Sequence, residues 1–148
     1  MRLHLRVLGV LAIVASAAAC DESLSTLAGP TPKLEPTFSS IQRDIFETTD
    51  VAGRVACVGC HTNVGRTPAG GLNLLAGVSY GNLINISSVQ RAGVLRVVPG
   101  NPDASYLAQK IDGTPGIIGR RMPFNAPYLS EGQILIIRSW IEKGAQNN

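Results

Sequence analysis

The sequence has few residues that bind metals. Its 148 residues include three cysteines, two histidines and two methionines. After residue 20, only four residues of these types remain: Cys57, Cys60, His61 and Met122. A structural zinc site needs four Cys, His or carboxylate ligands, usually as two pairs, and the chain has no second Cys or His pair. The composition therefore argues against a zinc site.

Aromatic residues and strand patterns are also scarce. Phe, Trp and Tyr make up 5% of the chain, and no apolar alternation reaches the length of a strand. What remains is a small number of short helical patterns with long loops between them. These observations predict an all-α domain whose own side chains form only a modest core.

The cysteines and the histidine stand together in one motif, Cys57-Val58-Gly59-Cys60-His61. Cys-x-x-Cys-His is the attachment signature of a c-type haem. Two thiols three residues apart can both add to the vinyl groups on one edge of a porphyrin, and the histidine that follows can bring its imidazole to the iron. We therefore predict one covalent haem c, held by Cys57 and Cys60, with His61 as an axial ligand. A porphyrin would also add apolar mass to the modest core.

A thioredoxin-type redox pair is the other reading of two cysteines at this spacing. Such a pair sits at a helix start within a strand–helix–strand unit. The residues around Cys57 and Cys60 do not show that pattern. The sequence therefore favours haem attachment over redox dithiol chemistry.

Residues 1–19 have the pattern of a secretory signal peptide. Arg2 and Arg6 precede an apolar run from Val7 to Val14, and small residues follow up to Ala19. The apolar run is shorter than the roughly 20 residues of a stable membrane-spanning helix. We expect the protein to be exported, which agrees with the haem motif because bacteria attach haem c outside the cytoplasm.

Cys20 follows Ala17-Ala18-Ala19, and this segment resembles a bacterial lipoprotein cleavage site. At such a site the cysteine becomes the lipid-modified first residue of the mature chain. Ala17 stands where these sites more often have leucine, and ordinary cleavage that leaves a free thiol is the alternative. We expect a lipid anchor at Cys20 that holds the protein on the periplasmic side of a bacterial membrane; the alternative is a soluble periplasmic protein.

The 129 residues after the leader predict one small domain on a tether. Residues 20–37 are rich in Ser, Thr, Pro and Gly and are predicted to be a flexible tether, with the domain in residues 38–148. Because Arg2 and Arg6 leave with the leader, 11 basic residues remain against 10 acidic ones, a net charge of +1. This near-neutral chain gives no support for nucleic-acid binding.

Helical patterns begin and end the predicted domain. Ile41, Ile45 and Phe46 share one face of a first helix that Ser39 or Ser40 can cap. Ser130 and Gln133 form a capping box for the last helix, which carries an apolar stripe with Trp140 and ends at Gly144. Shorter helices are predicted at residues 80–85 and from Asn101-Pro102 through Ile111. We expect three to five short helices, with the first and last packed together.

Met122 is the predicted second axial ligand. It is the only methionine after Met1, lies 61 residues beyond His61, and stands in a Gly- and Pro-rich loop just before Pro123. A loop methionine can reach the opposite face of a porphyrin, whereas a packing role is the alternative for so adaptable a side chain. Thioether and imidazole together raise the reduction potential and leave no open iron position. This pair predicts an electron carrier rather than an enzyme.

Supporting roles are less specific. The Pro68 carbonyl is a candidate to bind the outer nitrogen of His61 and so orient its ring. Candidates to bind the haem propionates are Arg96, Arg120, Arg121, Tyr80 and Tyr128, because Arg offers two parallel donors. A solvated charge or a packed aromatic ring is the simpler reading of each.

These residues resemble the class I cytochrome c family over about residues 38–145. The resemblance rests on a helix leading to the haem motif, a Met-Pro pair at Met122-Pro123, and a last helix with Trp140. More narrowly, two segments are similar to planctomycete-type cytochrome c domains: residues 96–107, and Arg121-Met122-Pro123 followed by Tyr128-Leu129-Ser130. Pro68 departs from the family, since it follows His61 more closely than the usual haem-facing proline.

The resemblance implies a small cytochrome c-like domain wrapped around one haem c, and one-electron transfer between redox partner proteins that it does not name. We expect a single-haem electron carrier joined to a membrane through a lipid anchor. One alternative is a haem c subunit through which electrons enter a membrane or periplasmic oxidoreductase complex. A haem-based sensor or weak peroxidase, which would need Met122 to dissociate, is the other.

Overall fold

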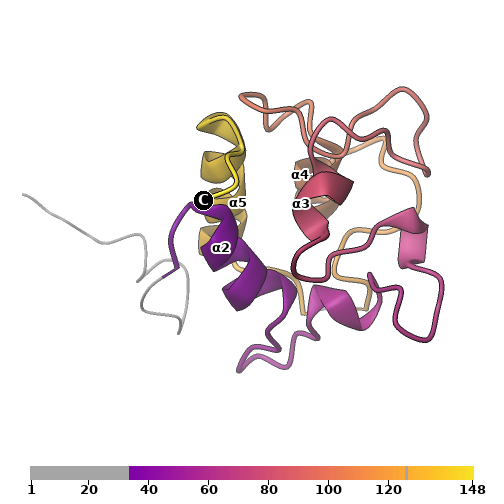
Figure 1. Ribbon diagram of the computed structural model, residues 1–148, viewed down its shortest axis with the longest axis vertical. Coiled ribbons are helices and arrows are strands. Elements are labelled where there is room, and N and C mark those ends of the chain that lie inside the picture. The colour runs from indigo at the N-terminus through magenta and orange to yellow at the C-terminus, as the bar shows by residue number, and fades with distance from the viewer. Residues whose placement is uncertain (1–33, 126) are drawn as a thin grey trace, which may run out of the picture.

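The computed structural model describes residues 34–125 and 127–148 (Figure 1). Within these residues the chain forms four α-helices and three shorter helical turns: α2 (Phe38–Ile41), the π-helical η1 (Gln42–Phe46), the 3₁₀ turns η2 (Cys57–Gly59) and η3 (Ala69–Gly71), α3 (Ser79–Leu83), α4 (Tyr106–Asp112) and α5 (Glu131–Glu142). The same residues contain two isolated β-bridges and no strand. The predicted helical class is confirmed for this part of the chain.

The predicted leader, Cys20 and most of the predicted tether lie outside the described residues. The end of that tether, however, belongs to the folded domain: Leu34 is buried in the core with 4% of its surface exposed. No helix in the described ranges has the length and apolar character needed to cross a membrane.

The first helix, α2, begins earlier than predicted, because its N-cap is Thr37 rather than Ser39 or Ser40. Thr37 is the N-cap, and its hydroxyl accepts a hydrogen bond from the Ser40 backbone N–H at 3.3 Å. An N-cap residue has non-helical backbone angles, but Ser39 and Ser40 both lie within α2, and Ser40 is buried. The helix then widens into η1, in which Ile45 and Phe46 are buried as the sequence predicted.

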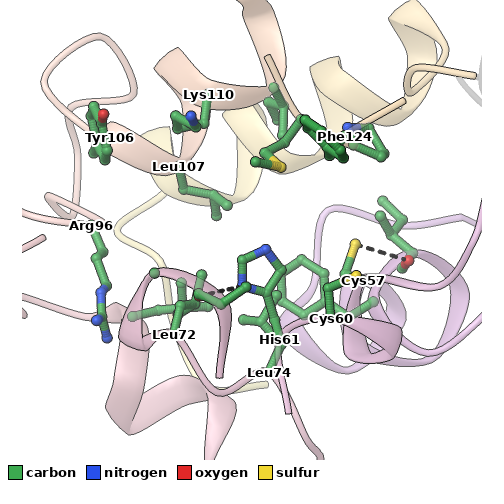
Figure 2. A pocket seen from close by; sticks show the side chains of 18 of the residues that line it. Cys57, Cys60, His61, Leu72, Leu74, Arg96, Tyr106, Leu107, Lys110 and Phe124 are labelled. Atoms are coloured by element: carbon green, nitrogen blue, oxygen red, sulfur yellow. Dashed lines mark hydrogen bonds between the residues drawn. The ribbon is translucent and has the colours of Figure 1, made fainter. Parts of the chain in front are cut away.

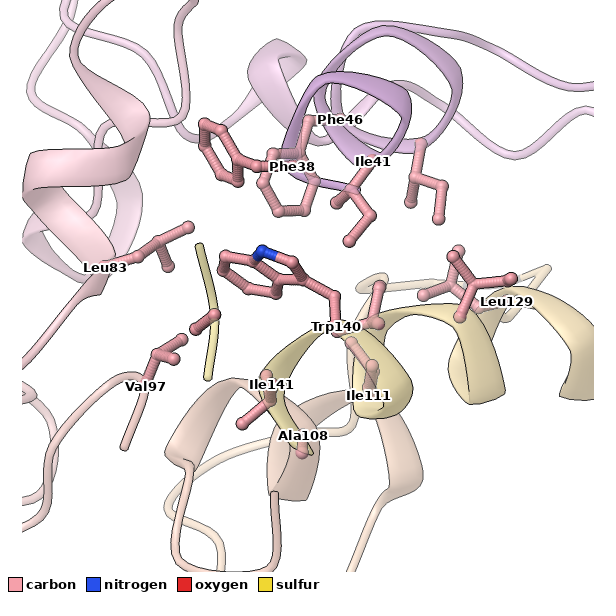
Figure 3. Close-up of a cluster of buried hydrophobic side chains, with 14 of the residues drawn as sticks. Phe38, Ile41, Phe46, Leu83, Val97, Ala108, Ile111, Leu129, Trp140 and Ile141 are labelled. Atoms are coloured by element: carbon pink, nitrogen blue, oxygen red, sulfur yellow. The ribbon is translucent and has the colours of Figure 1, made fainter. Parts of the chain in front are cut away.

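The last helix, α5, follows the sequence prediction closely. Both hydrogen bonds of the Ser130–Gln133 capping box are present, and Gly144 follows the helix with a positive φ of 95°. Trp140 is 1% exposed, donates its indole N–H to the Gln146 carbonyl at 2.8 Å, and lies 5.4 Å from the Phe38 ring between centroids (Figure 3). α2 and α5 therefore pack together, as predicted, and Figure 1 shows them side by side.

The two middle helices differ from the predicted bounds. α4 begins at Tyr106 with Ser105 as its N-cap, not at Asn101-Pro102. Asn101 instead closes a turn, because its side-chain oxygen accepts from the Ala104 N–H at 3.0 Å. Gly113 ends α4 with φ +74°, and a Cβ at this position would lie 2.7 Å from Cδ of Arg121, so both the backbone angle and the close approach require glycine. α3 covers Ser79–Leu83 rather than residues 80–85.

Candidate cofactor-binding site

A cavity of about 330 Å3 opens inside the domain and is lined mainly by apolar side chains. Its lining includes Cys57, Cys60, His61 and Met122, the four residues that the sequence singled out as cofactor ligands. Cys20, the predicted lipidation site, lies outside the described residues. The fold thus gathers the four candidate ligands around one space, although Met122 is 61 residues from His61 in the sequence.

The cavity has two facing walls (Figure 2). We call one the histidine wall; it carries His61, Leu72 and Leu74 beside the two cysteines. The other, which we call the methionine wall, carries Leu107, Lys110 and Phe124. Met122 belongs to this second wall because its N–H donates to the Lys110 carbonyl at 2.8 Å.

Backbone hydrogen bonds form the Cys-x-x-Cys-His motif into a tight turn. In η2 and just after it, the Cys57 carbonyl accepts from the N–H groups of Cys60 at 3.2 Å and His61 at 2.9 Å. This turn brings both cysteines and the histidine to the same cavity. Cys57 and Cys60 are free thiols, the first half-buried and the second exposed. In residues 34–125 and 127–148, no group of three His, Cys, Asp or Glu side chains is arranged to hold a metal ion by itself.

The His61 ring is oriented by a carbonyl one residue beyond the predicted one. Nδ1 of His61 lies 2.9 Å from the Ala69 carbonyl oxygen. The Pro68 prediction is wrong, because the Pro68 carbonyl accepts from the Gly71 N–H within the η3 turn. Burial lowers the pKa of His61 despite that hydrogen bond, and the nearby cations Arg96 and Lys110 lower it further. The ring is therefore neutral near pH 7. Its Nδ1–H donates to the Ala69 carbonyl, and the lone pair on Nε2 is available to bind a metal.

The Cys57 thiol lies in an environment that disfavours its thiolate. Burial raises its pKa above the ordinary value, although Arg54 acts in the opposite direction, and its Sγ lies 3.7 Å from the Ile45 carbonyl oxygen. Redox dithiols depend on a cysteine whose pKa is lowered at a helix start or beside a cation. The structure thus supplies a physical argument against the thioredoxin-type reading of this motif.

Arg54, which no sequence pattern singled out, stabilises the segment that precedes the Cys-x-x-Cys-His motif. Its side chain is fully buried, pairs with Asp50 at 3.0 Å and donates to the carbonyls of Ile45 and Thr48 at 3.1 and 3.3 Å. Arg54 thereby joins η1 to the segment that leads into Cys57. A pattern search could not have found it, since an arginine three residues before a motif is normally a surface charge.

Two buried cations line the cavity without acidic partners. Arg96 is 7% exposed and donates to the carbonyls of Asn82 at 2.7 Å and Gly71 at 2.9 Å. Lys110, equally buried, donates to the carbonyls of Ile118 and Arg120. Neither takes part in an ion pair in the described ranges. A cavity with buried positive charge and no carboxylate in its lining suits a cofactor that carries acidic groups.

Among the five candidates for binding propionates, Arg96 alone lines the cavity in the part of the chain that the structure describes. The Arg121 guanidinium carbon lies 4.3 Å from the ring centroid of Tyr128, and that of Arg120 lies 5.1 Å from the centroid of Phe124. Tyr80 donates its hydroxyl to the Ala145 carbonyl at 3.0 Å and packs on Phe38. These four residues thus contact other side chains or backbone groups and are absent from the cavity lining.

The donor set fits a covalently held haem. Two free thiols lie beside the His61 imidazole. Its Nδ1 is hydrogen-bonded to the Ala69 carbonyl, so its Nε2 is available to bind a metal. A thioether-bearing residue lies on the facing wall, and the space between is apolar and within the roughly 300–1,000 Å3 that cofactor sites occupy.

Comparisons of the chain with protein-family models, with curated proteins and with solved structures found no match.

Proposed function

We propose that this protein is a one-electron carrier that holds a single c-type haem in the cavity between its two walls, as its resemblance to class I cytochromes c implies. One observation carries the proposal. Cys57, Cys60, His61 and Met122 are the only Cys, His and Met residues in the described ranges, and all four line one apolar cavity. If Met122 served only to fill space in the core, its position beside the Cys-x-x-Cys-His motif would be a coincidence, whereas an axial ligand has to lie there.

Each ligand would have a distinct role. Cys57 and Cys60 would hold the haem through thioether bonds, His61 would ligate through Nε2, and Met122 would ligate through its sulfur. A bound haem would supply one iron that accepts and releases a single electron. The apolar lining would favour the porphyrin over water, and the Ala69 carbonyl would keep the imidazole in one orientation, so the protein should change little between the two charge states.

A thioether opposite an imidazole favours a carrier over an enzyme or sensor. Both axial positions would be filled, so neither oxygen nor peroxide would have a site. The proposed location is the periplasmic side of a bacterial membrane, with a lipid on Cys20 and redox proteins as partners. A haem c subunit of a larger complex would have the same ligands and would differ only in a permanent partner.

The decisive experiment is expression of the full chain together with haem-maturation machinery. We expect a coloured protein whose mass exceeds that of the processed polypeptide by one haem and one lipid. The double variant C57S/C60S should lose the covalent haem but keep the lipid, and the matched variant C20S should lose the lipid but keep the haem. A colourless protein, or one with the mass of the bare polypeptide, would overturn the proposal.

A second measurement separates the carrier from a sensor or peroxidase. The reduced wild-type protein should bind carbon monoxide poorly at neutral pH, because the methionine occupies the site that carbon monoxide needs. M122A should bind it readily and should have a lower reduction potential. Ready binding by the wild type would instead support the sensor or peroxidase.

A further inference from the structure

The segment from Thr114 to Asn125, which carries Met122, contains no helix or strand. Its backbone therefore needs partners outside itself to hold one conformation. Those partners come from α4, the helix that directly precedes it. Four residues of α4 contact the segment through hydrogen bonds: Tyr106, Gln109, Lys110 and Ile111.

Lys110 makes the most of these contacts. Its ammonium donates to the carbonyls of Ile118 at 2.9 Å and Arg120 at 2.6 Å, and its own carbonyl accepts from the Met122 N–H at 2.8 Å. One residue thus binds the methionine segment at three points, all of them within four residues of Met122. Burial of an ammonium without an acidic partner costs free energy, and here its hydrogen bonds to the two carbonyls offset part of that cost.

Tyr106 adds a fourth point on the same face of α4. It lies four residues before Lys110, the spacing that places two side chains next to each other on a helix. Its hydroxyl accepts from the Ile118 N–H at 3.0 Å. Both backbone groups of Ile118 are therefore held by side chains of α4, one by Tyr106 and the other by Lys110.

We propose that Lys110 is the positioning residue for the second haem ligand: its ammonium clamps the Ile118 and Arg120 carbonyls and so holds Met122 against the cavity. The inference rests on the proposed function, since it presupposes that Met122 ligates. Without the clamp, the segment would keep its hydrogen bonds to the Lys110 carbonyl, the Ile111 carbonyl and the Tyr106 hydroxyl, but it would lose the two to the Lys110 ammonium. Met122 would then spend part of its time away from the cavity.

The test is the affinity of the oxidised haem-loaded protein for imidazole, a small ligand that competes with Met122. K110M keeps the length of the side chain and removes all of its donors. K143M is the matched control, because Lys143 is an exposed lysine at the end of α5. We expect K110M to bind imidazole about tenfold more tightly than the wild type, and K143M to bind it with wild-type affinity. Wild-type affinity in K110M would overturn the proposal.

A double variant separates positioning from a general loosening of the cavity. In the M122A background the competing ligand is already absent, so K110M should add no further gain in imidazole affinity. An equal gain in both backgrounds would show that Lys110 acts on the cavity as a whole and would overturn the proposal. The absorption that oxidised haem shows only with a sulfur ligand should weaken in K110M and persist in K143M.

Two outcomes remain to be distinguished. If M122A itself leaves imidazole affinity unchanged, then Met122 is not the ligand and the proposed function fails. If M122A raises the affinity and K110M does not, only the role of Lys110 fails. Should K110M not fold, Y106F takes its place, since it removes only the hydroxyl that holds the Ile118 N–H. We expect it to raise the affinity about threefold, and an unchanged affinity would contradict the clamp.

Discussion

The histidine wall is held mainly by its own backbone, whereas the methionine wall is held mainly by side chains of another element. The His61 ring and carbonyl bind Ala69 and Leu74, both within 13 residues of it, through main-chain groups. The Met122 segment depends on Tyr106 and Lys110 of α4.

This difference has a thermodynamic consequence. Substitutions at Ala69 or Leu74 keep the carbonyl and N–H that hold His61, but a substitution at Lys110 removes the contact itself. A region held by few side-chain contacts opens more easily than one held by a local hydrogen-bonded turn. The methionine side is therefore where an added ligand should first gain access, while His61 should resist displacement by such a ligand.

Replacement of Trp140 should affect both walls together and have the largest effect on stability. The indole is 1% exposed and contacts Phe38, so W140A would leave a cavity where α2 meets α5. We expect a loss of about 3–5 kcal/mol in the free energy of unfolding, measured by denaturant titration. L135A, on the half-exposed face of the same helix, is the control and should cost much less. A similar loss in both variants would place the shared core elsewhere.

Among substitutions that affect only one wall, replacement of Arg54 beside the histidine wall should lower the free energy of unfolding most. R54M would leave the Ile45 and Thr48 carbonyls without their donor and Asp50 without its buried partner. We expect a loss of about 3 kcal/mol in the free energy of unfolding. R43M is the matched control: the side chain of Arg43 is 65% exposed, and no measurable change is expected. If R54M were as stable as R43M, the histidine wall would not depend on the side chain of Arg54.

Replacement of Arg96 should change the reduction potential. Its buried guanidinium is a positive charge in the cavity lining, and positive charge favours the reduced form of a bound metal centre. R96M should lower the potential by an amount on the order of tens of millivolts, measured by redox titration of the haem-loaded protein. K143M again removes one charge from the surface and should leave the potential nearly unchanged. Equal shifts in the two variants would point to net charge rather than to the cavity.

Sequence reasoning succeeded where the pattern lies in consecutive residues. The Cys-x-x-Cys-His motif is five residues long, and the capping box of α5 is a local pattern, so the grouping of the motif's side chains at one cavity and the helix cap could both be predicted without a structure. The placement of Met122 in the cavity was reached by elimination, because the chain offers no other methionine after Met1.

Sequence reasoning failed where a backbone group or a long-range contact decides. Pro68 was predicted to orient His61, but a carbonyl has no side-chain signature, and the turn places that of Ala69 there instead. Asn101-Pro102 has the form of a helix start, yet the buried hydroxyl of Ser105 accepts from the Val98 N–H and donates to the Asn101 carbonyl, which keeps this segment a turn. The burial of Lys110 depends on a segment that folds back over α4, and no local pattern announces it.

The smallest expected effect concerns the attachment of α4 to α5. Arg138 of α5 pairs with Asp112 at the end of α4 at 2.7 Å, and also with the exposed Asp103. D112N would weaken a partly exposed pair, so it should cost about 0–1 kcal/mol in the free energy of unfolding. Because α4 carries the contacts that hold Met122, imidazole affinity should nevertheless rise slightly. D103N, which acts on the same arginine from an exposed position away from the end of α4, is the control. A rise in D103N equal to that in D112N would separate the methionine wall from the docking of α4.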